Sequence, residues 1–252
     1  MKDMNDGIRK ISFSGTIAFW HGSRHGLIGS PQHDYPNARE TCDFGRGFYL
    51  NTSEEYAKCW ICASENSQFY KVVVDTEKIR CIELSDMDWA MYIAINRGYV
   101  KAPIIKEYFD LVLFSYDAVY GKIADDRMNN VMRRFFNNEI TTISFVKALE
   151  VIDLGNQLAL KTENACNSIY SIENIFIDIA ERERISKKNW EIKNKKFLIT
   201  NEILEKHHFE GKFFSDIVGK MEEKVTLRTK ILKENIRNLT PKNEQQIIGP
   251  KM

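Results

Sequence analysis

Two short segments that combine glycine with ring-bearing side chains most constrain what this chain can fold into. The first is Phe-Trp-His-Gly-Ser at residues 19–23, which ends an apolar run beginning at Thr16. The second is Asp-Phe-Gly-Arg-Gly-Phe-Tyr-Leu at residues 43–50, where two glycines precede an aromatic pair. This spacing predicts a tight turn that leads into a strand with a ring at its start. A histidine donor, an open glycine backbone and an exposed ring suit a flat heterocycle that carries an amide.

Composition indicates a folded protein of one large domain, or of one medium domain with an appendage. The chain has 252 residues, of which 43% are apolar, so it can bury a sizeable core. Its apolar runs fall short of the roughly 20 residues that cross a bilayer, and its first residues lack the apolar stretch of a signal peptide. Five irregularly spaced cysteines fit a reducing compartment. We therefore expect a cytoplasmic protein with no membrane segment.

Charge is nearly balanced overall but is unevenly divided along the chain. The net charge is +1, with +4 in residues 171–252 and about −3 in residues 1–170. Neither part is basic enough for a general nucleic-acid-binding surface. The densest basic run, 187–196, alternates with apolar residues at helical spacing. A solvated helix face is favoured there over an RNA-binding surface.

Strands and helices are mixed through residue 170, whereas helices predominate afterwards, so we predict domains at residues 1–170 and 171–252. Alternating and β-branched residues predict strands at 16–21, 47–51, 69–75, 80–84, 116–121 and 157–161, with the third and fourth forming a pair. Helical spacing predicts helices from Thr52 to about 64 and at 89–96, 126–136, 144–151 and 225–239. Thr52 with Glu55 forms the expected capping box of the first helix.

The order of these motifs resembles the ADP-ribosyltransferase superfamily of the His-Tyr-Glu kind. The shared order is His-Gly, then Gly-x-Gly-Phe-Tyr before a helix with aromatic residues, then Asn-Gln at the start of a late strand. More narrowly, His-Gly-Ser and Asp-Phe-Gly-x-Gly-Phe-Tyr-Leu resemble a bacterial family described as a domain of unknown function. The resemblance covers about residues 16–170. It implies an α+β fold of split antiparallel sheets with flanking helices, followed by a helical C-terminal appendage.

The resemblance further implies that NAD is bound, as a substrate, and gives roles to residues by position. His21 would hydrogen-bond the adenosine-side ribose, and the backbone of Gly22 would hold the nicotinamide carboxamide. Tyr49 would stack on the nicotinamide ring. The remaining residues of the implied site are Ser23 after the glycine, Gly47 and Phe48 of the turn, and the helix aromatics Trp60 and, as its substitute, Tyr56.

The catalytic strand departs from the pattern that the resemblance implies. Cleavage of the N-glycosidic bond builds positive charge on the ribose, which an anion stabilises. The superfamily uses a glutamate at the start of the late strand, where this chain has Gln157. Glutamine orients a hydroxyl but supplies neither a full charge nor a proton acceptor. Asp125 and Asp126, at a strand-to-helix junction, are the candidate replacement, and the alternative is that one of them caps the helix.

Several residues also have ordinary structural interpretations. Phe48 and Trp60 would serve equally well as core residues, and Asp43 is expected to order its own turn. Cys59 and Cys62 have the spacing of a redox or metal pair, but the context favours buried helix cysteines, and no metal site is expected.

Two functions remain open for the chain, with a purely structural interaction protein as a weaker third. The leading one is transfer of ADP-ribose from NAD to a macromolecular acceptor, as in bacterial toxins or anti-phage effectors. The alternative is a catalytically weakened regulatory module that binds NAD or a related nucleotide, which Gln157 would explain. Residues 173–221 loosely resemble a small helical bacterial protein encoded beside members of this family, which implies a fused antitoxin-like partner. A plain helical extension that packs on the core is the alternative there.

Overall fold

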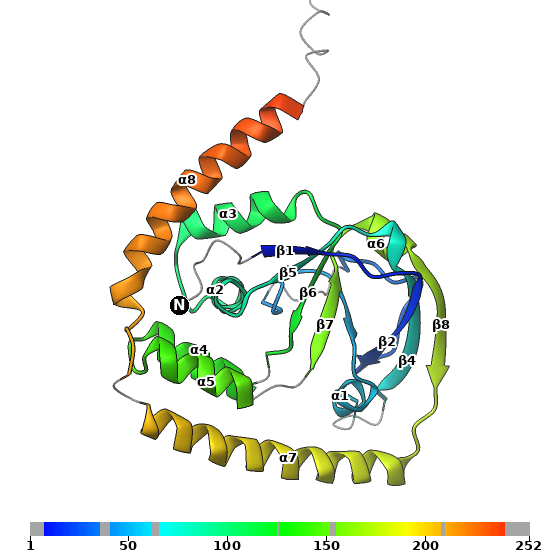
Figure 1. The fold of residues 1–252 in the computed structure, drawn as a ribbon. Helices are drawn as coiled ribbons and strands as arrows, with labels where there is room; N and C mark the ends of the chain where they lie inside the picture. The colour runs from blue at the N-terminus through cyan, green and yellow to red at the C-terminus, as the bar shows by residue number, and fades with distance from the viewer. Residues whose placement is uncertain are drawn as a thin grey trace, which may run out of the picture.

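The protein is an α+β structure in which helices pack beside an eight-stranded sheet and leave its edge strand β8 uncovered (Figure 1). The computed structural model describes residues 8–35, 41–61, 66–124, 126–151, 155–207 and 210–239. The strands are β1 (Ile8–Ile11), β2 (Thr16–Ser23), β3 (Phe48–Asn51), β4 (Gln68–Asp75), β5 (Cys81–Leu84), β6 (Ala118–Lys122), β7 (Asn156–Leu160) and β8 (Ile169–Ile175). All six strands predicted from the sequence are present, with ends shifted by one or two residues.

The sheet has the strand order β1-β5-β6-β7-β3-β2-β4-β8. At its centre, the described residues of β2 and β3 are joined by a single residue pair, Trp20 with Asn51. The sheet therefore consists of two halves, β1-β5-β6-β7-β3 and β2-β4-β8, that meet at a narrow junction. The predicted pairing of 69–75 with 80–84 is wrong, because β4 and β5 belong to different halves.

One strand pair departs from the expected antiparallel arrangement. Strands β5 and β6 are parallel, whereas the other pairs between described strands are antiparallel. A parallel pair needs a crossover connection, since the chain must return to the same end of the sheet. Helices α2 (Asp86–Asn96) and α3 (Pro103–Leu113) form that crossover.

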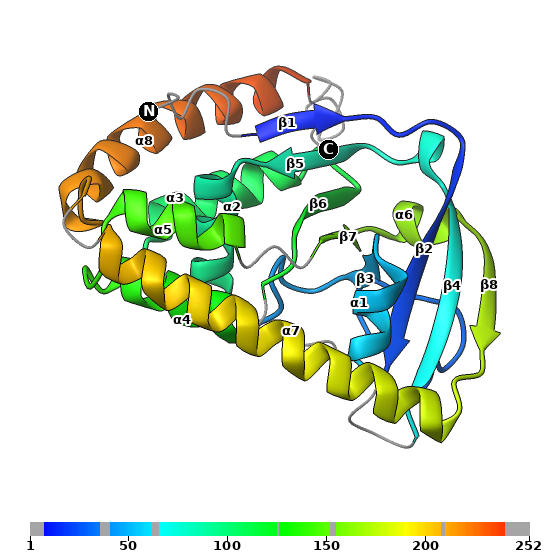
Figure 2. The same cartoon turned by 60° about the horizontal axis from the view of Figure 1, so that its bottom comes forward.

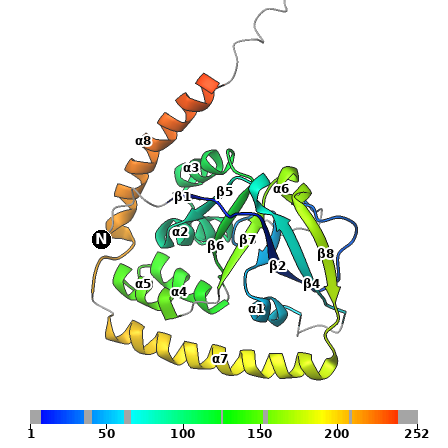
Figure 3. The same cartoon turned by 45° about the vertical axis from the view of Figure 1, so that its right-hand side comes forward.

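The remaining helices pack against parts of the sheet and against one another. They are α1 (Glu54–Cys59), α4 (Asp126–Phe136), α5 (Thr142–Val151), α6 (Glu163–Asn167), α7 (Ile179–Lys206) and α8 (Ser215–Leu239), with a short 3-10 turn at Thr76–Lys78. Figure 3 shows the outer strand β8 leading into α7. Helix α7 then passes α1 and reaches α5, and α8 packs along α3 (Figure 2).

The residues after 170 share the hydrophobic core with the residues before it. Strand β8 runs across position 170 and pairs with β4, so the sheet continues to Ile175 before the two long helices begin. Leu204 of α7 and Met221 and Val225 of α8 are buried in the main core cluster. Phe214, between these helices, packs edge-on against Phe136 with ring centroids 4.9 Å apart. The C-terminal helices are thus integrated into the packing of the preceding residues.

Helix boundaries follow local side-chain hydrogen bonds. Ser85 caps α2, where its hydroxyl accepts from the backbone N–H of Asp88 at 3.4 Å, so the helix begins at Asp86, three residues before the predicted start. Helix α1 differs from the prediction, because Ser53 rather than Thr52 is its cap and accepts from Tyr56 N at 3.4 Å. The Thr52 hydroxyl instead donates to the carbonyl oxygen of Asn156 at 2.9 Å, which ties α1 to the start of β7.

Helix α1 lies directly against strand β2, and Gly22 permits this close approach. A Cβ at Gly22 would lie 2.8 Å from the carbonyl oxygen of Ala57 and 3.1 Å from a methyl group of Ile61. The first of these neighbours is backbone, so it cannot rotate away. The absence of a side chain at position 22 therefore sets the distance between α1 and the sheet.

We expect Gly22→Ala to lower the free energy of unfolding by about 1–3 kcal/mol, because the added methyl group must displace α1. Gly219→Ala is the matched control, since a methyl group added at position 219 of α8 would meet no described atom within 4 Å outside its own helix. That control is expected to gain roughly 0.5–1 kcal/mol from helix propensity. Urea denaturation of both variants checks this, and equal effects at the two positions would contradict it.

Candidate functional site

A cleft of about 890 Å³ opens where the two halves of the sheet meet α1, α4 and α7. This volume lies within the range of roughly 300–1,000 Å³ that is typical of ligand pockets. Six residues proposed from the sequence line it together, namely His21, Gly22, Tyr49, Tyr56, Trp60 and Gln157. They come from β2, β3, α1 and β7, so only the fold brings them into one place.

The imidazole of His21 is held in one orientation. Its Nδ1 lies 2.8 Å from the carbonyl oxygen of Tyr49, and its ring lies over the ring of Phe48 with centroids 4.5 Å apart. A carbonyl oxygen only accepts, so Nδ1 carries the proton, and Nε2 of the neutral ring is an acceptor. Burial lowers the pKa of His21, which the hydrogen bond to Tyr49 partly offsets. The ring is therefore neutral at pH 7.

Tyr49 forms a rigid wall of the cleft. Its hydroxyl donates to the carbonyl oxygen of Gly45 at 2.6 Å and accepts from the backbone N–H of Phe44 at 2.9 Å. Gly45 has φ +71°, a backbone conformation that favours glycine, so the hydroxyl fastens a turn that needs this residue. Burial raises the pKa of Tyr49 well above its ordinary value. The side chain therefore remains protonated at neutral pH.

Helix α1 contributes the second pair of aromatic rings. Trp60, at the end of the helix, remains 49% exposed at the mouth of the cleft. The ammonium group of Lys196, from α7, lies 5.9 Å from the centroid of the Tyr56 ring, within the range of a cation–π contact. Both residues line the cleft, and aromatic rings of this kind are suited to stacking.

Gln157 and Asp43 form a hydrogen-bonded pair within the cleft. The Gln157 amide donates from Nε2 to Asp43 Oδ2 at 2.7 Å and to the carbonyl oxygen of Lys122 at 3.2 Å. Asp43 forms an ion pair with Arg97 and accepts from the backbone N–H of Ala124 at 3.0 Å. The expectation that Asp43 orders its own turn is wrong. Its carboxylate joins the turn before β3 to three distant segments.

Three residues implied by the resemblance lie outside the lining of the cleft. The Ser23 hydroxyl donates to the carbonyl oxygen of Gly26 at 2.8 Å and so orders the loop after β2. A Cβ at Gly47 would lie 2.9 Å from the carbonyl oxygen of Leu160, so this glycine lets β3 approach β7. Phe48 is only 3% exposed and lies beneath His21. These three residues shape the loop, the strand contact and the packing next to the cleft without lining it.

The acidic pair proposed as the catalytic anion is only partly described. Asp125 lies outside the described residues, and Asp126 is the first residue of α4 but its side chain lies outside them too. Their neighbour Arg127 lines the cleft. A catalytic or capping role for either aspartate stays a prediction.

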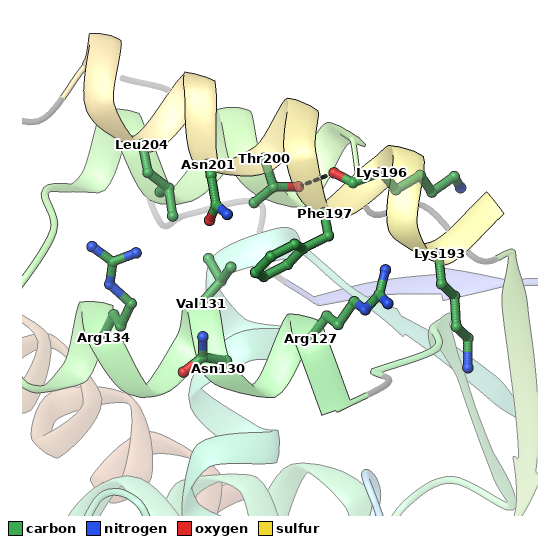
Figure 4. A pocket seen from close by; sticks show the side chains of 10 residues that line it. All are labelled: Arg127, Asn130, Val131, Arg134, Lys193, Lys196, Phe197, Thr200, Asn201 and Leu204. Carbon is green, nitrogen blue, oxygen red and sulfur yellow. Dashed lines mark hydrogen bonds between the residues drawn. The ribbon is translucent and has the colours of Figure 1, made fainter. Parts of the chain in front are cut away.

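Cationic side chains surround the cleft, and sequence patterns alone did not identify them as site residues. Arg24, Arg97, Arg127 and Lys193 all line it. Arg127 and Lys193 also line a narrow groove between α4 and α7, in which Figure 4 shows Arg127 and Arg134 of α4 pointing towards α7. Clustered positive charge in a concave surface attracts phosphate groups. The basic run 187–196 thus contributes to the cleft through Lys193, on the side of α7 that faces the rest of the protein.

Metal clusters and membrane-spanning helices are both absent from the described part of the chain. It contains no group of three His, Cys, Asp or Glu side chains that could hold a metal ion. None of its helices is both long and apolar enough to span a membrane. Four of the five cysteines are described, and two of these, Cys81 and Cys166, are buried.

The structure is that of an α+β protein with a cleft lined by aromatic and cationic side chains. Residues 17–170 match the family described as "Protein of unknown function (DUF3990)". Because the match spans more than half of the 252 residues, the chain belongs to this family. Comparison with curated proteins finds no match, and comparison with solved structures finds none either. The expected membership of a family of unknown function is thus confirmed.

We expect the burial of His21 to make stability depend on pH. The pKa of His21 is lowered in the folded protein, so between that value and about 6.5 the unfolded chain binds more protons. The contribution of His21 to the free energy of unfolding is fully present above about pH 6.5. It is lost as pH falls through the folded pKa, at up to about 1.4 kcal/mol per pH unit.

Urea denaturation at pH 7.5 and pH 5.5 measures this loss. His21→Asn is expected to lose less stability than the wild type between these two conditions, since its amide does not titrate. His33→Asn, which changes a histidine outside the cleft lining, serves as the control and should behave as the wild type does. Equal pH dependence in the wild type and His21→Asn would contradict a neutral buried imidazole.

Proposed function

We propose that the protein binds NAD in this cleft and transfers ADP-ribose to a macromolecular acceptor, in the manner of a bacterial toxin or anti-phage effector. One observation carries the proposal. His21, Tyr49 and Trp60 come from three separate elements and line a single cleft. Packing alone would not require a neutral histidine, a rigid tyrosine and an exposed tryptophan to face the same space.

The individual groups match the parts of NAD. Nε2 of His21 accepts from a ribose hydroxyl, while Tyr49 provides a fixed surface for the nicotinamide ring. Trp60 or Tyr56 closes the opposite side of that ring. Arg24 and Lys193 supply positive charge for the pyrophosphate.

The architecture of the sheet also supports the proposal. Two half-sheets that meet through the pair Trp20–Asn51 fit the split arrangement of an ADP-ribosyltransferase-like fold. The cleft lies at this junction, with both residues of the pair in its lining. The parallel pair β5–β6 departs from an all-antiparallel arrangement but lies away from the cleft lining.

The reaction requires stabilisation of charge on the ribose. The bond between C1′ and the nicotinamide nitrogen breaks, and its electron pair leaves with nicotinamide, which becomes neutral. The ribose becomes an oxocarbenium ion, and the acceptor nucleophile then bonds to C1′ and loses its proton to solvent. Gln157 lies where the resemblance implies a catalytic glutamate, with its amide next to the carboxylate of Asp43.

The long helix α7 contributes to the proposed site, and both C-terminal helices share the core of the protein. Lys193 and Asn189 of α7 line the cleft, and Leu204 and Phe214 are buried in the main core. These contacts favour an extension that completes the domain over a separable antitoxin-like partner. A fused antitoxin-like partner would be expected to block the cleft, whereas α7 forms part of its lining and leaves it open.

A second function, NAD binding without efficient cleavage, is favoured by one observation. Gln157 has an amide where a carboxylate would supply a full negative charge. In this case the cleft binds NAD, and the protein acts as a regulatory module rather than as an enzyme.

Incubation of the purified protein with NAD and chromatographic measurement of nicotinamide release tests the proposal. We expect His21→Ala and Trp60→Ala to lower the release rate by about 10²-fold, because each removes a group that positions NAD. His33→Ala and Trp190→Ala are matched controls outside the cleft lining and should retain the wild-type rate.

Calorimetric titration with NAD separates the two functions. Binding without release by the wild-type protein would favour the regulatory module. Neither binding nor release would contradict both functions.

A further inference from the structure

The orientation of the Gln157 amide is determined by its surroundings. Both of its Nε2 contacts, Asp43 Oδ2 at 2.7 Å and the carbonyl oxygen of Lys122 at 3.2 Å, are acceptors. Only the NH₂ group of an amide can face two acceptors, so the oxygen must occupy the other position. Oε1 has no hydrogen-bond partner within the described part of the chain, and Gln157 lines the cleft. Oε1 is therefore the atom of this side chain that remains to accept from a ligand.

The carboxylate that orients Gln157 is itself fixed. Asp43 is 6% exposed, and Arg97 binds its Oδ1. Its Oδ2 accepts from both Ala124 N and Gln157 Nε2. Bonds to both oxygens prevent rotation of the carboxylate. The guanidinium group of Arg97 also compensates the negative charge of this buried side chain.

A charged acceptor bonded to the NH₂ group of an amide raises the acceptor strength of the amide oxygen. A hydrogen bond from an amide N–H to a carboxylate is stronger than one between neutral groups. Hydrogen bonds in series polarise one another in the low-dielectric interior, and electron density in the amide shifts towards its oxygen. Oε1 of Gln157 is thus a better acceptor than the oxygen of an unpaired glutamine.

We propose that Asp43 is a positioning residue for NAD cleavage, which holds Oε1 of Gln157 towards the ribose and polarises the Gln157 amide so that Oε1 becomes the stronger acceptor. This inference rests on the proposed function of the cleft. A carboxylate and an amide together take the place of the single glutamate that the resemblance implies. The carboxylate lies one side chain further from the ribose than a glutamate would place it, and it is paired with Arg97.

A double-mutant cycle at positions 43 and 157 tests the coupling. Asp43→Asn removes the charge and leaves the Gln157 amide without a carboxylate partner. Nicotinamide release is expected to fall by about 10²-fold or more, as it does when a preorganised electrostatic contact is lost. Adding Gln157→Glu to Asp43→Asn restores a carboxylate at the ribose, so release is expected to recover by at least about tenfold.

The same Gln157→Glu change should not help when Asp43 is present. Two carboxylates would then face each other where Nε2 and Oδ2 now lie 2.7 Å apart, and the pair would share a proton. An equal effect of Gln157→Glu in both backgrounds would overturn the proposal, because it would show that the two positions act independently. Asp110→Asn, on the exposed surface of α3, is the control for loss of an aspartate charge.

A readout that needs no NAD separates this inference from the proposed function. In ¹⁵N-labelled protein, the Gln157 side-chain amide signal is identified by its loss in Gln157→Glu. A downfield, slowly exchanging proton that shifts in Asp43→Asn but not in Asp110→Asn would establish the pair even if NAD were not a ligand. An amide signal unaffected by Asp43→Asn would overturn the pairing itself, whatever the result with NAD.

Discussion

The structure around the cleft depends on the buried carboxylate of Asp43. It connects the turn before β3 to Arg97 at the end of α2, to Ala124 before α4 and to Gln157 at the start of β7. An isolated charge in such a position would be strongly destabilising, whereas one whose oxygens are all bonded fixes the groups around it. The four segments enclose one side of the cleft, so the geometry of the site and the packing of these elements have a common origin.

A second constraint is the narrow junction between the two halves of the sheet. A continuous β2–β3 ladder would satisfy the backbone groups that now lie near the cleft. With Trp20 and Asn51 as the pair that joins the strands, the halves diverge, and α1 and α7 enclose the space between them. Gly22 allows α1 to approach at the same place. The cleft is therefore a consequence of how the sheet divides.

Local interactions explain why much of the fold could be predicted. Alternating residues specify β4, and the Ser85 hydroxyl together with the left-handed Gly98 delimits α2 within a few residues. The predicted cap of α1 differs from the observed one by one residue, because Thr52 and Ser53 are both good capping residues. The choice depends on Asn156, a distant residue whose carbonyl oxygen accepts from the Thr52 hydroxyl. The strand pairing of β5 could not be deduced, since it depends on a crossover through two helices.

The sequence by itself determined the mixed α+β class of the protein and the turn of residues 43–50 that leads into β3. These features rest on backbone preferences and on side chains close together in the chain. Only the tertiary structure decided that Asp43 accepts a hydrogen bond from Gln157 and that Lys193 of α7 lines the cleft. Those contacts join residues more than a hundred positions apart, and no local pattern encodes a partner whose place is set by the packing of the whole chain.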